Sequence, residues 1–214
     1  MDFMTIVDIF LHLDTHLTEW ATQYGTLIYF LLFAVIFCET GLVVMPFLPG
    51  DSLLFVAGLV AALGKMDPFI VAGAMGAAAV LGDSTNYLIG RTLGEKLFSN
   101  PNSKIFRRDY LERTHAFYEK HGGKTVTLAR FLPIVRTFAP FVAGVGEMPY
   151  LRFLAFSVFG TILWVGGLVT LGYYFGNVEF IRKNLSVLII AIIGVSFIPV
   201  IGAALKERFR KQPA

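Results

Sequence analysis

The chain has 214 residues, of which 56% are hydrophobic and only 15% are charged, and its mean hydropathy is +0.68. Soluble domains carry about a quarter charged residues, so this composition excludes an ordinary soluble protein and indicates a polytopic, all-α integral membrane protein. A spanning helix needs about 20 residues, so residues 1–214 form a single membrane domain with at most about four to six passes. Cys38 is the only cysteine, which excludes a disulfide framework and a cysteine-rich metal site within one chain.

The net charge of +3 conceals an uneven distribution along the chain. Residues 1–64 contain six carboxylates and no Lys or Arg, whereas residues 91–124 contain eight basic side chains. The C-terminal segment adds Lys206, Arg208, Arg210 and Lys211. The positive-inside rule therefore places the 91–124 connector and the C-terminus in the cytoplasm, and the N-terminus outside. These basic clusters flank membrane spans, so topology explains them better than nucleic-acid binding does.

Residues 1–24 are predicted to form an amphipathic helix at the membrane interface, because their apolar side chains recur at helical spacing. His12 and His16 lie one turn apart and could ligate a metal, but no HExxH pattern accompanies them. We therefore expect a solvated polar face and no metal site. The basic stretch 95–124 predicts a second interfacial helix, a cytoplasmic connector whose basic face meets anionic headgroups.

The first long apolar block covers residues 27–64 and is interrupted by the sequence MPFLPGD. Pro46 and Pro49 lack amide donors, and Gly50 permits a sharp turn, so these residues are the expected break. The two arms are either two short spans or one hairpin that enters and leaves the membrane on the same side.

Two carboxylates belong to this block, and carboxylates inside a membrane are functional candidates by default. Glu39 lies within the first arm, far from any expected helix end. Asp51 lies at the turn, where it also suits the N-cap of the second arm. One role need not exclude the other.

Residues 69–90 predict a span rich in small side chains, which allows close approach of a neighbouring helix. Asp83 and Asn86 lie about one turn apart on one face of it. They either form hydrogen bonds between helices or contact a substrate directly, as supporting residues of a site.

Residues 125–146 read like a membrane segment, yet they contain Arg130 and Arg136 together with Pro133 and Pro140. An arginine at the bilayer centre costs about 2.5–3.5 kcal/mol on insertion scales. Two arginines beside two helix breakers cannot form a simple lipid-facing span. The prediction is a broken, re-entrant segment buried in protein, whose guanidinium groups face something anionic.

The two apolar halves resemble each other. The sequence FVAG occurs at residues 55–58 and again at 141–144, in each case just after a Pro-broken turn. Glycine pairs in the following spans match at one constant offset (Gly90 and Gly94 with Gly172 and Gly176).

We therefore predict an inverted repeat made of residues 27–94 and residues 125–176. Each repeat is a re-entrant helical hairpin followed by a transmembrane helix, the second at residues 152–176. An odd number of crossings per repeat inverts the second one, a pattern typical of transporters with a site at the bilayer midplane. A last transmembrane helix is predicted over residues 185–205.

The hairpin tips would approach each other, bringing Glu39 and Asp51 toward Arg130 and Arg136. Their meeting would offset part of the cost of burying four charges. Arginine stays charged and binds phosphate through two N–H groups at once, so one interpretation is a clamp for the phosphate of an anionic lipid. The carboxylates would then couple proton movement to release of the lipid.

Two other interpretations belong to different classes. In one, the four charged residues are only internal ion pairs of a structural or assembly protein. In the other, the chain is a membrane enzyme such as a lipid phosphatase. No histidine lies near the arginines, and the chain has no GxSxG elbow or metal-ligand spacing, so we expect neither an enzyme nor a cofactor.

Three long motifs resemble the DedA family of bacterial inner-membrane proteins over nearly the whole chain: ETGLVVMPFLPGDSLLFVAG, GDSTNYLIGRTLG and FYEKHGGKTVTLARFLPIVRTFAPFVAGVGEM. One departure is Ser157, where the family often has Asn. The resemblance implies two opposed re-entrant hairpins, a fold shared with VTT-type lipid scramblases. The important acidic positions of the family fall on Glu39 and Asp51, and its important arginines on Arg130 and Arg136.

The resemblance also implies a multi-pass protein of the inner membrane that recycles undecaprenyl phosphate and depends on the proton motive force. The implied partners are a polyprenyl phosphate or another anionic phospholipid, membrane lipids and protons, with a homo-oligomer left open. A proton-coupled transporter of cations or osmolytes is the alternative, as is a scramblase or envelope-maintenance protein without coupled transport.

Overall fold

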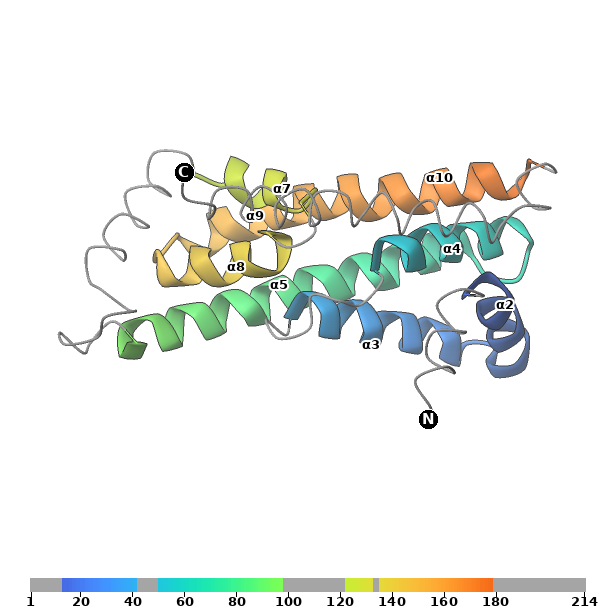
Figure 1. Cartoon of the computed structure of the whole chain (residues 1–214), viewed down its shortest axis with the longest axis horizontal. Coiled ribbons are helices and arrows are strands. Elements are labelled where there is room, and N and C mark those ends of the chain that lie inside the picture. The colour runs from blue at the N-terminus through green and yellow to red at the C-terminus, as the bar shows by residue number, and fades with distance from the viewer. Residues whose placement is uncertain (1–12, 42–49, 98–121, 133–134, 179–214) are drawn as a thin grey trace, which may run out of the picture. The chain divides into compact units, whose positions relative to one another are not determined.

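The computed structural model of the protein describes residues 13–41, 50–97, 122–132 and 135–178 (Figure 1). These residues form helices and turns, with no strand among them. In chain order the helices are α2 (Leu13–Tyr24), α3 (Leu27–Gly41), α4 (Gly50–Ala62), α5 (Pro68–Leu97), α7 (Lys124–Ala129), α8 (Val135–Val145), α9 (Tyr150–Thr161), the π-helical turn η1 (Ile162–Gly166) and α10 (Gly167–Gly176). The predicted all-α architecture is therefore confirmed for the described residues.

Several predicted features lie outside the described residues. They are the first half of the N-terminal helix, most of the basic connector, the span at 185–205, and Pro46, Pro49 and Pro133. α2 covers the second half of the helix predicted over residues 1–24. α5 continues to Leu97, into the range predicted for the connector.

Among the described residues, two helices are long and apolar enough to cross a membrane, by their length and composition. Pro68–Leu93 is most of α5, and Tyr150–Gly176 combines α9, η1 and α10. They correspond to the spans predicted at 69–90 and 152–176. α3, α4 and α8 have 15, 13 and 11 residues. At about 1.5 Å per residue these are roughly 16–23 Å long, so in their described extents none could cross a ~30 Å hydrocarbon core alone.

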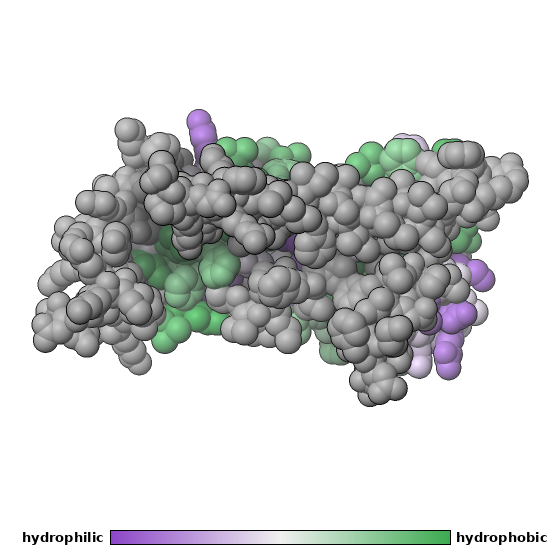
Figure 2. Space-filling view, in the orientation of Figure 1, coloured by the Kyte–Doolittle hydropathy of each residue, from purple (hydrophilic) through white to green (hydrophobic). Residues whose placement is uncertain are grey.

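Large apolar side chains cover much of the exposed surface of these helices. Side chains more than six-tenths exposed include Leu27, Phe30, Phe69, Leu128, Leu151, Ile162 and Tyr174. In Figure 2 much of the described surface that is visible is hydrophobic. Such a surface is unfavourable in water and suits contact with lipid.

The described residues divide into two compact units. Unit 1 contains residues 13–30, 50–72 and 168–178, and unit 2 contains 31–41, 73–97, 122–132 and 135–167. Unit 2 thus holds most of α3 and α5, together with α7, α8, α9 and η1.

In unit 1, α4 and α10 pack with their backbones in close contact. A Cβ atom added at Gly58 would overlap the carbonyl oxygen of Val169, and one at Gly172 would overlap the carbonyl oxygen of Phe55. The rings of Phe55 and Phe175 extend this contact, with centroids 6.1 Å apart. Only glycine allows such an approach, as in the small-residue interfaces of membrane helices.

In unit 2, α5 and α8 pack in the same reciprocal way. A Cβ added at Gly144 would overlap the carbonyl oxygen of Tyr87, and one at Gly90 would overlap that of Phe141. In both units, therefore, an FVAG segment offers its phenylalanine carbonyl to a glycine of a long helix. The glycine of the FVAG segment in turn meets the backbone carbonyl of the residue three positions before that helix glycine.

The starts and ends of the helices follow ordinary capping chemistry. Asp67 caps α5, because its Oδ1 atom accepts hydrogen bonds from the amides of Phe69 at 2.8 Å and Ile70 at 3.0 Å. Pro68 occupies the first helical position, where its missing amide proton costs nothing.

α4 and α8 end in the same kind of turn. A residue in the left-handed conformation follows each helix, Gly64 with φ +73° and Glu147 with φ +52°. In each turn an amide donates back to the carbonyl five residues earlier, from Lys65 at 3.3 Å and from Met148 at 3.1 Å. Both are Schellman-type caps.

The break predicted at Pro140 is wrong. α8 runs from Val135 to Val145 straight through it, and the break in this segment falls between α7 and α8. Pro140 removes the donor to the carbonyl of Arg136, which lies in the first turn of α8. The clash and the lost bond therefore fall on the first turn of α8, and they do not end the helix.

We predict that Gly144→Ala lowers the thermal stability of the detergent-solubilised protein, because the added methyl group meets a backbone carbonyl that cannot move without separating α5 from α8. Overpacking of this kind costs about 1–3 kcal/mol. Gly73→Ala is the matched control, since Gly73 is also helical and nothing lies within 4 Å of its Cβ position. A melting temperature for Gly144→Ala equal to that of Gly73→Ala would contradict the close packing.

Candidate functional site

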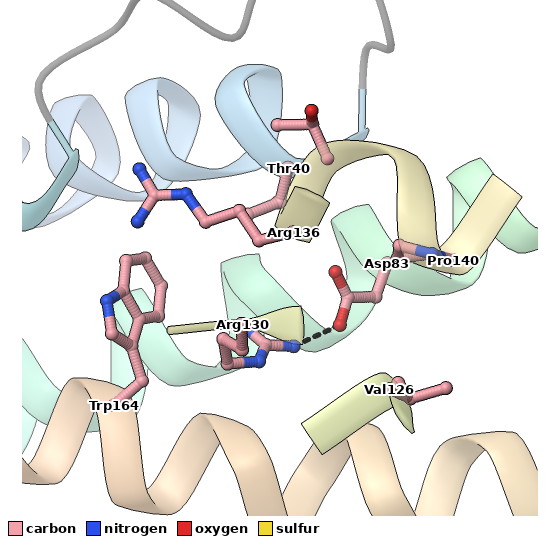
Figure 3. Close-up of a pocket in the computed structure, with 8 residues that line it drawn as sticks. Thr40, Asp83, Val126, Arg130, Arg136, Pro140 and Trp164 are labelled. Atoms are coloured by element: carbon pink, nitrogen blue, oxygen red, sulfur yellow. Dashed lines mark hydrogen bonds and ion pairs between the residues drawn. The ribbon is translucent and has the colours of Figure 1, made fainter. Parts of the chain in front are cut away.

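Two buried ion pairs form the polar centre of unit 2, and Figure 3 shows the one between Arg130 and Asp83. Each arginine comes from one side of the break between α7 and α8: Arg130 follows the last turn of α7, and Arg136 lies in the first turn of α8. The carboxylates come from two other helices, Asp83 from α5 and Glu39 from α3.

Arg130 forms the first pair. Its Nη2 atom donates a hydrogen bond to Oδ2 of Asp83, and both side chains are buried. Ser157 of α9 joins them: its Oγ donates to the same Oδ2 atom at 2.6 Å and accepts from Arg130 Nη2 at 3.3 Å. Gly160 gives the arginine room, because a Cβ there would lie 3.3 Å from Arg130 Nε.

Arg136 forms the second pair. Its Nη2 atom donates to Oε1 of Glu39 at 2.5 Å, and the Glu39 side chain is completely buried. Removing one partner of a buried pair leaves an uncompensated charge and typically costs 3–5 kcal/mol. The two pairs are therefore strong constraints on how the four segments pack.

One aromatic ring contacts both arginines. The guanidinium carbon of Arg130 lies 5.6 Å from the ring centroid of Trp164, and that of Arg136 lies 5.1 Å from it. Figure 3 shows the indole ring beside both arginine side chains. Cations at these distances are attracted to the negative face of an indole ring.

Asn86 ties the segments that carry the second pair to α5. Its Nδ2 atom donates to the carbonyl oxygen of Thr40 in α3 at 3.2 Å and to that of Thr137 in α8 at 2.6 Å. The side chain is fully buried. This amide therefore holds the residues next to Glu39 and Arg136 at fixed places.

A small cavity of about 10 Å³ lies between these groups. It is lined by Thr40, Asp83, Val126, Arg130, Arg136, Thr137, Pro140 and Trp164. That volume is about what one water molecule needs. A phosphate group is larger, so the site would have to widen to admit one.

The structure brings some, but not all, of the site residues predicted from sequence close together. Arg136 pairs with Glu39, as predicted from the expected approach of the two hairpin tips. Arg130 instead pairs with Asp83. Asp51 belongs to unit 1, where it lies half-buried in the first turn of α4. Its approach to the arginines stays a prediction.

Asp83 and Asn86 both form bonds between helices, which was one of the two roles expected of them. Ser157 and Trp164 were missed as site residues. Ser157 is a buried polar side chain in a mostly apolar span, and its place four residues from Thr161 and seven from Trp164 puts all three on one helix face. That spacing is the signal that could have found them.

Comparison with known proteins supports a single family. Residues 48–174 match the VTT domain. The chain is 57% identical over 196 residues to Protein DedA of Escherichia coli K12, covering 91% of this chain and 90% of that protein. It is 48% identical over 170 residues to an uncharacterized membrane protein of Mycobacterium leprae, covering 79% and 76%. It is 31% identical over 191 residues to the inner membrane protein YghB of E. coli K12, covering 86% and 87%. No solved structure matches the chain.

The matched domain begins just before α4, ends within α10, and includes Asp83, both arginines and Trp164. The similarity to E. coli DedA extends over nine-tenths of both chains, far beyond a shared motif. Together with the two helices of spanning length, these matches confirm the resemblance in the motifs: the chain belongs to the DedA family of membrane proteins.

Proposed function

We propose that this protein moves an anionic lipid across the bacterial inner membrane, and that Arg130 and Arg136 hold the phosphate of that lipid. The observation that carries the proposal is the burial of both guanidinium groups around one small cavity, each bound to a carboxylate. A phosphate can replace a carboxylate on a guanidinium group, because both anions accept the same pair of N–H donors.

The burial of these charges favours a function over a purely structural role. Replacing a buried ion pair by apolar side chains of similar volume is often neutral or stabilising. Two such pairs among mostly apolar helices are therefore a costly way to hold a fold together. They are a reasonable way to keep two cations ready for an anionic ligand.

The proposed architecture is an inverted repeat of two broken hairpins, each followed by a spanning helix. Its support is the packing within each unit. The FVAG segments of α4 and α8 make the same reciprocal glycine contacts with α10 and α5, and both helices end in the same left-handed turn. Inverted repeats with interrupted helices place transport sites near the bilayer midplane.

The proposed cargo is a polyprenyl phosphate such as undecaprenyl phosphate, which the family resemblance implied. Proton movement through Glu39 and Asp51 would drive release, with the C-terminus in the cytoplasm and the chain crossing the inner membrane several times. Transport rather than catalysis is proposed, because exchange of one anion for another on the arginines needs no nucleophile and no cofactor.

The decisive experiment is transport of labelled polyprenyl phosphate in proteoliposomes, with and without a pH gradient across the membrane. We expect movement that requires the protein and becomes faster when a gradient is imposed. The absence of protein-dependent movement under both conditions would refute the proposal.

Arg136→Lys is predicted to reduce transport at least about tenfold while leaving the melting temperature nearly unchanged. Lysine keeps the charge that pairs with Glu39, but it is a point charge and cannot bind phosphate through a planar fork. Arg152→Lys is the matched control, because Arg152 is an exposed arginine of α9 outside the cavity. Full transport activity of Arg136→Lys would contradict the proposed binding of phosphate through the planar fork of Arg136.

A paired replacement separates transport from a merely structural ion pair. Asp83→Leu alone leaves Arg130 buried without its carboxylate, so we expect a loss of about 3–5 kcal/mol of stability, measured as a lower melting temperature. Adding Arg130→Met removes the stranded charge and should restore most of that stability.

Transport by the Asp83→Leu/Arg130→Met protein should nevertheless stay below about a tenth of the unmodified protein's rate, because one arm of the clamp is gone. If the double variant regains both its melting temperature and its transport, the pair serves only to hold the fold together.

A further inference from the structure

Trp164 is the one side chain whose ring lies within 6 Å of both guanidinium groups in the part of the chain that the structure describes. The two arginines carry like charges and lie around one cavity, so they repel each other whenever their carboxylates are absent. The indole ring attracts both, and this attraction strengthens where water is excluded. Trp164 is only 4% exposed, so the contact is a buried one.

The ring differs from the carboxylates in one respect that matters for exchange. A phosphate competes directly with Asp83 and Glu39, because all three are anions that accept from the same guanidinium groups. It does not compete with the face of an indole ring. Trp164 can therefore keep its contacts with Arg130 and Arg136 when the carboxylates leave.

The backbone around Trp164 is unusual. It lies at the centre of η1, a single π-helical turn within a helix that is otherwise α-helical from Tyr150 to Gly176. The neighbouring side chains Ile162 and Leu163 are 64% and 46% exposed, whereas Trp164 points into unit 2. Single π turns of this kind occur frequently at functional sites.

We infer that Trp164 is the positioning residue of the clamp, whose ring holds the guanidinium groups of Arg130 and Arg136 together while a phosphate exchanges with their carboxylates. This inference rests on the proposed function of the two arginines. It assigns no chemistry to Trp164 itself, which acts through the arginines.

The first test measures how transport depends on the amount of polyprenyl phosphate in proteoliposomes. Trp164→Leu keeps an apolar side chain but removes the ring, and it should raise the mole fraction needed for half-maximal transport about tenfold. Trp164→Phe keeps a smaller aromatic face and should raise it less than about threefold. Phe159→Leu, an exposed residue of the same helix, is the control and should change nothing.

Two results would overturn the inference. One is a half-maximal mole fraction for Trp164→Leu equal to that of Phe159→Leu. The other is equal damage by Trp164→Phe and Trp164→Leu, which would assign the effect to the size of the side chain rather than to its aromatic face.

A second test does not depend on transport. The chain has two tryptophans, so Trp20→Phe leaves Trp164 as the only source of indole fluorescence. Titrating this detergent-solubilised protein with dodecyl phosphate should shift the emission of Trp164 in a saturable way, because the guanidinium groups move on its face. Adding Arg136→Gln should change the starting emission and abolish the saturable shift.

The two tests distinguish the proposals from each other. If the unmodified protein moves no polyprenyl phosphate but dodecyl phosphate shifts the emission saturably, the transport proposal fails and the positioning role stands. If Arg136→Gln leaves the emission unchanged and dodecyl phosphate has no effect, the positioning role fails whatever the transport assay shows.

Discussion

The structure of unit 2 depends on the need to neutralise two arginines among apolar helices. A buried guanidinium group without a partner is too costly to keep, so Arg130 and Arg136 each require a carboxylate at hydrogen-bonding distance. That need links α5 and α3 to the break between α7 and α8. Asn86 then fixes the backbones of α3 and α8 against α5, so that the charges meet at defined places.

Close backbone packing is the second constraint, and it makes the first one possible. Long side chains can span the centre of a small helical unit only where the helices themselves lie near each other. The reciprocal contacts of Gly90 and Gly144 bring α5 and α8 to that distance, and Gly160 leaves room for Arg130 beside α9. The glycines of this chain are therefore part of the same arrangement as its charges.

Much of this could be predicted from sequence, because hydrophobic length and buried charge are local signals. Both spanning helices, the four charged side chains now seen in two pairs and the FVAG repeat were all identified that way. The carboxylate that pairs with Arg130 could not be predicted from sequence, since the choice between Asp83, Glu39 and Asp51 depends on how separate segments align. The break predicted at Pro140 was wrong because the effect of a proline on a helix depends on where in the helix it lies. For Trp164 the spacing from Ser157 and Thr161 was a usable signal, although the π turn that carries the tryptophan leaves no mark in the hydrophobic pattern.

The size of the cavity and the balance of charge together limit how a phosphate could be carried. Two guanidinium groups and two carboxylates sum to zero, and the space between them suits about one water molecule. A phosphate that binds both arginines would need more space than this, which displacement of the two carboxylates would provide. Each displaced carboxylate is left in apolar surroundings, where it must gain a proton or reach water. In the proposed mechanism, uptake of the anion and protonation of the carboxylates would be parts of one exchange, and this exchange would couple transport to protons.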